Sequence, residues 1–117
     1  MTMICRMLLG LILGIAAVES ASAQDRTVYG FAMNSCGQWQ QYRTAKDVAS
    51  AQLEAYVDGF LSGYNMAYDG LDLLAATPND KGVSFHIWID NYCRDKPLDT
   101  LSQAVVALKN ELLARAR

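Results

Sequence analysis

The stretch 85–93, FHIWIDNYC, carries the pattern on which the predicted fold depends. Its apolar residues recur at i, i+3, i+4 and i+7, a spacing that places side chains on one face of an α-helix. The residues at these positions are Phe85, Trp88, Ile89 and Tyr92. Cys93 follows one turn after Ile89 and therefore lies on the same side. The stretch predicts a helix that buries an aromatic face and carries a cysteine near its end.

Residues 1–23 have the three-part pattern of a secretory signal. Arg6 supplies a positive charge, 7–18 reads MLLGLILGIAAV, and an A-x-A cleavage motif closes at Ala23. The apolar run is shorter than the ~20 residues that a membrane-spanning helix needs. We therefore expect cleavage after Ala23, a mature chain that starts at Gln24, a periplasmic location, and no membrane insertion after cleavage.

Cys36 and Cys93 are the cysteines left in the mature chain, because Cys5 precedes the apolar run of the signal. An even pair in a small exported chain predicts one structural disulfide. Cysteines this far apart in sequence are more often structural than redox-active. Closing a loop of this length is worth ~4 kcal/mol in chain entropy if the native geometry permits the bond. Such a bond supports a domain whose size limits its core.

The charge balance argues against a nucleic-acid-binding or membrane-binding surface. The chain has 12 Asp and Glu residues and 10 Lys and Arg residues, for a net charge of −2. Only Glu19 and Arg6 fall within the predicted signal, so the mature chain keeps that charge. Nucleic acids and anionic membranes attract basic surfaces. The predicted organisation is a signal over 1–23, a short N-terminal arm over 24–34, and one helical domain over 35–117.

Two helices are predicted in the first half of the domain. The first runs to Arg43, with Asn34 or Ser35 as its N-cap. The second runs from about Ser50 to Tyr68, where apolar residues recur at helical spacing. Its apolar stripe consists of Leu53, Val57, Phe60, Leu61, Tyr64 and Tyr68.

Two further helices complete a small all-α, orthogonal four-helix bundle cross-linked by one disulfide. The third is expected to begin with Ser84 as its cap and to end before Pro97. The fourth is expected to begin after Asp99 or Thr100, because Thr100-x-x-Gln103 matches a capping box. Its apolar stripe consists of Leu101, Val105, Leu108 and Leu112.

Small residues recur at every fourth position of the second helix, as Ala55, Gly59, Gly63 and Ala67. Glycine costs roughly 1 kcal/mol inside a helix relative to alanine. Gly59 and Gly63 therefore predict that another element packs closely against this row within the monomer. A homodimer seam and a ligand groove are the alternatives. Gly70 is expected to end the helix in the left-handed conformation.

The residues of catalysis and metal binding do not gather into a motif. His86 is the sole histidine, and it reads as a surface pair with Asp90 on the face opposite the aromatic stripe. Ser62, in GFLSG, does not match the nucleophile elbow G-x-S-x-G. Asp69 and Asp72 lack the ligand count of a calcium loop. The sequence predicts a protein that is not an enzyme, has no catalytic residue, and binds no metal or cofactor.

Aromatic side chains are numerous for a chain of this size. Most belong in a core, but Tyr and Trp also carry binding hot spots. A helical surface with spare aromatic residues favours a protein-binding module over an enzyme. The candidate binding aromatics, which the sequence allows either in the core or at an interface, are Trp39, Tyr64, Tyr68, Trp88 and Tyr92.

The order of motifs resembles a family. A cysteine near the mature N-terminus is followed by YVDGFLSGYN, a loop, WIDNYC and KPLDTLSQAVVALKNEL. Over roughly 36–113 this is similar to the HdeA/HdeB-type small periplasmic proteins of Gram-negative bacteria. The resemblance implies an all-α fold with one disulfide and protection of client proteins in acid. This chain is richer in aromatics, poorer in lysine, and has an additional N-terminal arm.

A second group, the Rap/Tai family of periplasmic immunity proteins, is also similar. Its members neutralise type VI secretion effectors and have a Gly-rich helix and a cysteine before a Pro-led final helix. They usually carry further cysteines, which this chain lacks.

Two functions are therefore open, both with protein partners. As an acid-stress chaperone, the mature chain would move from a charge of −2 to about +10 when its carboxylates protonate, and self-repulsion would expose apolar stripes to unfolding clients. As an immunity protein, or another periplasmic helical interaction protein, it would present a rigid rim of aromatics and carboxylates to one partner. The first function requires loosening and the second requires preorganisation.

Overall fold

The computed structural model describes residues 28–70, 72–75, 77 and 82–117. The predicted signal over 1–23 and residues 24–27 of the predicted arm lie outside the described residues. Within them the chain forms a short 3-10 helix, η1, and four α-helices. In chain order these are η1 (Gly30–Met33), α1 (Cys36–Ala45), α2 (Val48–Ala67), α3 (Val83–Asp95) and α4 (Leu101–Ala116). The predicted all-α, four-helix fold with one disulfide is confirmed.

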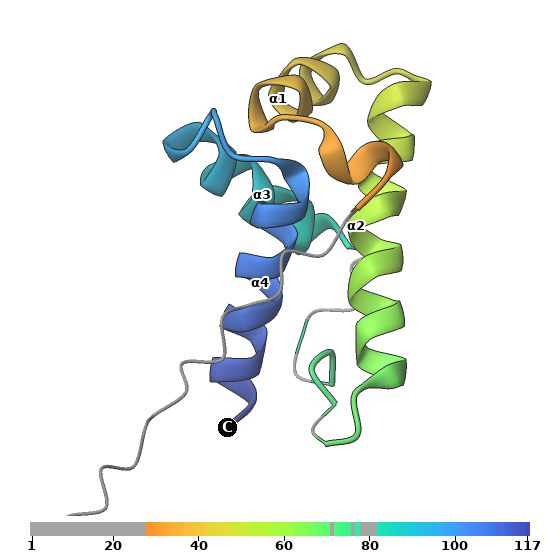
Figure 1. The fold of residues 1–117 in the computed structure, drawn as a ribbon, viewed down its shortest axis with the longest axis vertical. Helices are drawn as coiled ribbons and strands as arrows, with labels where there is room; N and C mark the ends of the chain where they lie inside the picture. The colour runs from red at the N-terminus through yellow and green to blue at the C-terminus, as the bar shows by residue number, and fades with distance from the viewer. Residues whose placement is uncertain (1–27, 71, 76, 78–81) are drawn as a thin grey trace, which may run out of the picture.

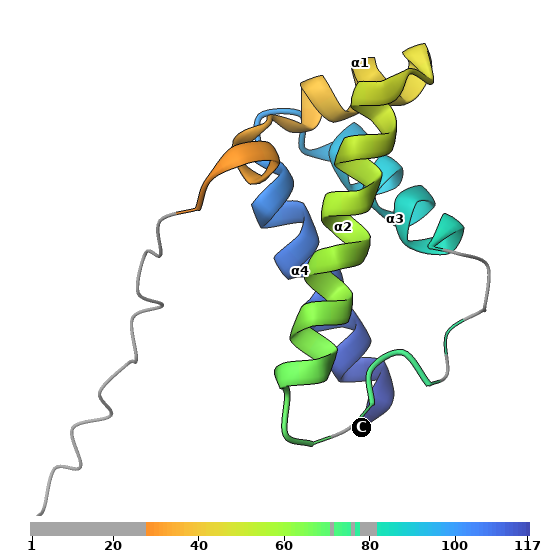
Figure 2. The same cartoon turned by 90° about the vertical axis from the view of Figure 1, so that its right-hand side faces the viewer.

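The two longest helices, α2 and α4, run side by side with their N-terminal ends at the same end of the molecule (Figures 1 and 2). Helix α1 lies across that end, and α3 crosses the bundle beside α4. Within the described ranges, none of the helices combines the length and the apolar character that crossing a membrane requires. The arrangement brings α1, α2 and α3 together around the polar cluster described below.

The N-terminal ends of α1 and α4 both carry capping boxes. Ser35 Oγ accepts from the Gln38 backbone N–H at 3.1 Å, and Gln38 Oε1 accepts from the Ser35 N–H at 2.8 Å. Thr100 and Gln103 make the same pair of bonds at 3.3 and 2.7 Å. Each box satisfies two backbone donors that the helix cannot bond itself. The box predicted at Thr100 is therefore confirmed, and Ser35 is the cap of α1.

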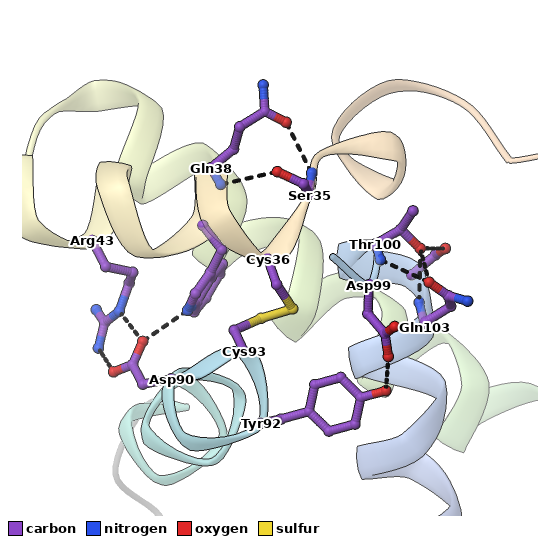
Figure 3. Close-up of a disulfide and its surroundings, with 12 residues drawn as sticks. Ser35, Cys36, Gln38, Arg43, Asp90, Tyr92, Cys93, Asp99, Thr100 and Gln103 are labelled. Atoms are coloured by element: carbon purple, nitrogen blue, oxygen red, sulfur yellow. Dashed lines mark hydrogen bonds and ion pairs between the residues drawn. A yellow bond between two sulfur atoms is a disulfide. The ribbon is translucent and has the colours of Figure 1, made fainter. Parts of the chain in front are cut away.

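The same two helix ends are joined to each other through the backbone. The Cys36 N–H donates to the Asp99 carbonyl and the Leu101 N–H donates to the Asn34 carbonyl, both at 2.7 Å. The two segments form an isolated antiparallel bridge. Figure 3 shows this junction beside the disulfide. Residues far apart in sequence thus fix where α1 starts relative to α4.

The core lies where the apolar faces of the four helices meet. The apolar stripes predicted on the second and fourth helices contribute Leu53, Val57, Leu61, Leu101, Val105, Leu108 and Leu112 to the core. The core residues with the least exposed surface include Cys36, Trp39, Leu53, Val57, Ile89, Cys93, Leu101, Ala104 and Val105. Burial of these side chains at ~25 cal/mol per Å² of apolar area is the main force that holds the bundle together.

Helix α2 begins earlier and ends differently from the prediction. Its N-cap is Asp47, whose side chain accepts from the Ser50 N–H at 3.1 Å, so the helix starts at Val48. Its C-cap is Tyr68 in the extended region, with φ −80°. Gly70 does not have positive φ. The prediction that Gly70 ends the helix in the left-handed conformation is wrong, because the chain leaves the helix two residues earlier.

Helix α3 is capped by Gly82 and not, as predicted, by Ser84. Gly82 has φ +83°, a left-handed conformation that glycine adopts without strain. A Cβ at this position would lie 2.5 Å from Asp58 Oδ1 on α2. The close approach of that carboxylate gives a second reason for glycine here. Gly82 therefore permits close packing between the start of α3 and α2.

Gly59 and Gly63 do not lie against another element, so the prediction of close packing at this row is wrong. A Cβ at either position would meet no heavy atom within 4 Å, and both residues are exposed. Spacing by four residues identifies one face of a helix but not what covers it. In α2 the face that meets the core is that of Leu53, Val57 and Leu61.

Gly59→Ala is therefore expected to stabilise the protein by about 0.5–1 kcal/mol, because alanine costs less backbone entropy in a helix. Urea denaturation at pH 7 measures the change. Gly82→Ala is the matched control, and it should destabilise the protein because of its positive φ and the nearby Asp58. A lower midpoint for Gly59→Ala would show that the row is covered after all.

Candidate functional site

Charged and polar side chains from three helices converge on Arg43 of α1. Its Nη1 donates to Glu54 Oε1 of α2 at 2.6 Å. Its Nε and Nη2 donate to the two carboxylate oxygens of Asp90 of α3 at 3.0 and 2.8 Å (Figure 3). Asp90 Oδ1 also accepts from the indole Nε1 of Trp39 at 2.7 Å. One guanidinium therefore connects α1, α2 and α3.

The ion pairs around Arg43 are half-buried, with side-chain exposures of 27% for Arg43 and Glu54 and 31% for Asp90. Burial alone would raise the pKa of Asp90. The hydrogen bonds from Arg43 and Trp39, together with the positive charge of Arg43, outweigh burial and hold that pKa below its usual value. The hydrogen bond to Asp90 likewise raises the pKa of Arg43. At neutral pH the pair is fully ionised.

His86 extends the cluster deeper between α2 and α3. Its side chain is only 8% exposed, with Nε2 at 2.8 Å from Asp58 Oδ1 and Nδ1 at 4.0 Å from Glu54 Oε2. The predicted surface pair of His86 with Asp90 is wrong. The two residues do lie four positions apart on one side of α3, but that side faces α1 and α2. Asp90 is therefore occupied by Arg43, and His86 pairs with Asp58 instead.

We call these residues the carboxylate network: Trp39, Arg43, Glu54, Asp58, His86 and Asp90. Ser50 of α2 adds a hydrogen bond from its hydroxyl to Glu54 Oε1 at 3.0 Å. The network contains three carboxylates, one arginine and one histidine, and each carboxylate contacts a basic side chain. It holds the three helices through attractions that depend on ionised carboxylates.

The disulfide between Cys36 and Cys93 lies beside the network and is confirmed. It joins the N-terminal end of α1 to the C-terminal end of α3, with 4.8 Å between the Cα atoms (Figure 3). Both cysteines are completely buried. Helices α1 and α3 are thus linked covalently at one end of their contact and by the Arg43–Asp90 pair further along it.

Of the two positions that the sequence allowed for Trp39, core or interface, the structure shows the core, where the side chain has no exposed surface. The edge of its ring faces His86, with 6.3 Å between the ring centroids. Its only polar group donates to Asp90, so the indole can be buried without an unpaired donor. Trp39 therefore donates a hydrogen bond within the polar cluster and has no exposed surface that a partner could contact.

Trp88 and Tyr92 are half-buried and stack on each other, with ring centroids 5.5 Å apart. Trp88 Nε1 donates to Glu111 of α4 at 2.9 Å, and the Tyr92 hydroxyl donates to Asp99 at 2.6 Å. Burial, followed by the bond to Asp99, raises the pKa of Tyr92 to about 12. The Nζ of Lys96 lies 5.0 Å above the Tyr92 ring. Both rings are held in fixed positions between α3 and α4.

Tyr64 and Tyr68 form a second stack near the end of α2, with ring centroids 5.5 Å apart. The Nζ of Lys109 lies 4.8 Å above the Tyr64 ring. Tyr64 is half-buried, whereas Tyr68 is exposed. The structure therefore divides the five candidate aromatics into one core residue, three half-buried residues, and one surface residue.

Among the residues that the structure describes, no group of three His, Cys, Asp or Glu side chains could hold a metal ion. Asp72 instead organises the turn after α2, where its Oδ1 accepts from Asn65 Nδ2 at 2.9 Å and from the Leu74 N–H at 3.0 Å. The bond from Asn65, followed by that from Leu74, lowers the pKa of Asp72.

Comparison of the chain with protein-family models, curated proteins and solved structures gives no match. The functional interpretation therefore depends on the geometry of the chain itself.

Sequence reasoning missed Arg43, Glu54 and Asp58 as members of the site. A signal was present, because Glu54 and Asp58 are the only charged residues of α2 and lie four positions apart. Two carboxylates on one face of an otherwise uncharged helix indicate that this face meets basic partners. The identity of those partners depends on how α1 and α3 pack.

Proposed function

We propose that the protein is an exported, non-enzymatic binding protein that loosens in acid and then binds unfolding proteins. The observation that carries the proposal is the carboxylate network, in which Glu54, Asp58 and Asp90 join α1, α2 and α3 through Arg43 and His86. The export pattern over 1–23 supports a periplasmic location, where proteins meet external acid directly. The HdeA-like order of motifs supports the same role.

Acid acts on the network in a defined direction. The pKa of Asp90 is lower in the folded protein than in the unfolded chain, so ionised Asp90 favours the folded state above the unfolded value of ~3.9. That contribution is lost as the pH falls from about 4 through the lower, folded-state pKa. Protonation of Asp90 removes the negative charge with which Arg43 pairs on α3, so the ionic link between α1 and α3 weakens.

The disulfide determines how far this loosening can go. Because Cys36 and Cys93 stay bonded, α1 and α3 cannot separate at that end of their contact. Leu53, Val57 and Ile89, which are buried at neutral pH, would be exposed while the chain stays compact. A compact state with exposed apolar surface can bind unfolding clients without itself becoming a random coil.

Purified protein is expected to keep an acid-labile periplasmic protein in solution when the mixture is acidified, because the exposed apolar faces cover those of the client. Light scattering of the client with and without the protein measures the effect. A helical protein of similar size at equal concentration is the control. Equal scattering with the protein and with the control would overturn the chaperone proposal.

The second candidate is a rigid binder that inhibits one effector, as an immunity protein does. The observation that favours it is the fixed position of the half-buried aromatics, with Trp88 bonded to Glu111 and Tyr92 bonded to Asp99. Preorganised aromatic side chains bind at low entropic cost. In this case tertiary packing would persist in acid and clients would aggregate as in the control.

A further inference from the structure

An open depression of about 400 Å³ lies between α1 and α3, on the outer side of the carboxylate network. We call it the basic groove. Its lining residues are Gln40, Arg43, Thr44 and Lys46 from α1 and its C-cap, and Asp90 and Arg94 from α3. Three of the six are basic and one is acidic, on a protein whose net charge is −2. The groove therefore differs in sign from the chain as a whole.

Most of the acceptor capacity of the acidic residue of the groove is used within the protein. The two oxygens of Asp90 accept three hydrogen bonds, one from Trp39 and two from Arg43. Lys46 and Arg94, by contrast, have no carboxylate within 4.0 Å among the described residues. The side chain of Arg94 donates to the neutral amide oxygen of Asn91 at 2.8 Å. Two positive charges of the groove are thus uncompensated at short range.

Arg43 provides a third, fixed donor. Three bonds to Glu54 and Asp90 and the face of the Trp39 ring, 5.6 Å from the guanidinium carbon, fix its orientation. A guanidinium has five N–H groups, so donors remain for a ligand. A donor that is already ordered loses little entropy when a ligand binds.

The C-terminal end of α1 carries the negative end of the helix dipole, which disfavours the binding of an anion. The negative end of a helix dipole is worth roughly 0.3–1 kcal/mol for one nearby charge. Lys46 occupies the C-cap of α1, where its positive charge offsets that end of the dipole. With Arg94 added from α3, the balance in the groove favours a negatively charged ligand.

We propose that the basic groove binds an acidic segment of a partner protein, with its carboxylates held by Lys46, Arg94 and the free donors of Arg43. The open form of the groove suits a chain that runs across it better than an enclosed small molecule. Three basic residues are few for a nucleic acid, whose repeated phosphates require an extended basic surface. This inference goes beyond the acid response, because the groove is charged and ordered at neutral pH.

The test is fluorescence anisotropy of a labelled octaglutamate peptide at pH 7 and low salt. Binding to the wild-type protein is expected, and it should weaken in 0.5 M NaCl, which screens exposed charges. The double variant Lys46→Ala/Arg94→Ala should bind roughly fivefold more weakly, as expected for two exposed charge pairs. The control variant Lys109→Ala/Arg117→Ala removes the same number of positive charges at positions outside the groove, and it should bind the peptide as the wild type does. Circular dichroism checks that each variant is folded.

Equal binding by the wild type and by Lys46→Ala/Arg94→Ala would overturn the proposal. An equal loss in Lys109→Ala/Arg117→Ala would also overturn it, because the peptide would then respond only to total charge. Labelled octathymidylate is measured in parallel. If octathymidylate binds as tightly as octaglutamate, and if Lys46→Ala/Arg94→Ala weakens both to the same extent, the assignment to an acidic protein segment is wrong.

Discussion

Cys36→Ser is expected to lower the free energy of unfolding by about 2–5 kcal/mol, the usual effect of removing a native disulfide from a small exported domain. The bond closes a loop with a sequence separation of 57 and joins α1 to α3 inside the core. Its loss frees the unfolded chain and removes the covalent link between two helices. The urea midpoint at pH 7 measures the change.

The double variant Cys36→Ser/Cys93→Ser is the matched control for this prediction. It should be destabilised to about the same extent as Cys36→Ser, because either change removes the same bond. If the double variant is destabilised much more than Cys36→Ser, each cysteine contributes separately through its packing. A midpoint equal to that of the wild type would show that the disulfide does not stabilise the fold.

Arg43→Leu is expected to destabilise the protein by about 2–3 kcal/mol at pH 7. Removing one member of a fully buried pair costs ~3–5 kcal/mol because its partner is left uncompensated, and the partial exposure of this site reduces the cost. The variant leaves Glu54 and Asp90 without their cation. The free energy of unfolding from urea denaturation gives the magnitude.

The effect of Arg43→Leu should depend on pH in a way that a packing defect does not. As the pH falls below about 4 and Asp90 protonates, the wild type loses the same interaction, so the difference between the two proteins should shrink. Arg115→Leu is the matched control, since its pair with Glu111 is exposed and worth at most about 1 kcal/mol. A difference that stays constant from pH 7 to pH 3 would contradict the electrostatic role of Arg43.

Several features predicted correctly from the sequence have a local chemical signal. The capping box at Thr100 and the apolar stripe of α4 depend on residues within a few positions of one another. The disulfide was predicted from the expected export and from the cysteine count. The capping box is complete within one turn of helix, whereas the stripe and the disulfide also depend on how the helices pack.

The wrong predictions for the row of Gly59 and Gly63 and for His86 depend on what covers a helix face. Gly59 and Gly63 have the spacing of a packing row, yet that row faces solvent because the opposite side of α2 meets the core. His86 was assigned to the surface because it lies on the face of its helix opposite the aromatic stripe. That face meets α2, where His86 pairs with Asp58. Periodicity defines a face but not its neighbour.

The candidate site illustrates the same limit for polar residues. Arg43 is 11 residues from Glu54 and 47 from Asp90, so no motif of fixed spacing joins them. Trp39 was a candidate for binding because Trp is common at binding hot spots, and the sequence does not show that Asp90 accepts from its buried indole. Only the packing of α1 against α3 brings these groups together.

The most direct test of acid-triggered loosening is a titration of the wild-type protein, with its disulfide intact, from pH 7 to pH 2 by circular dichroism. The near-ultraviolet bands of Trp39 and Trp88 report tertiary packing, and the far-ultraviolet signal reports helix content. We predict that the near-ultraviolet signal is lost below about pH 4 while most of the helix content persists. A near-ultraviolet signal that is unchanged at pH 2 would contradict the proposed function and would favour the rigid binder.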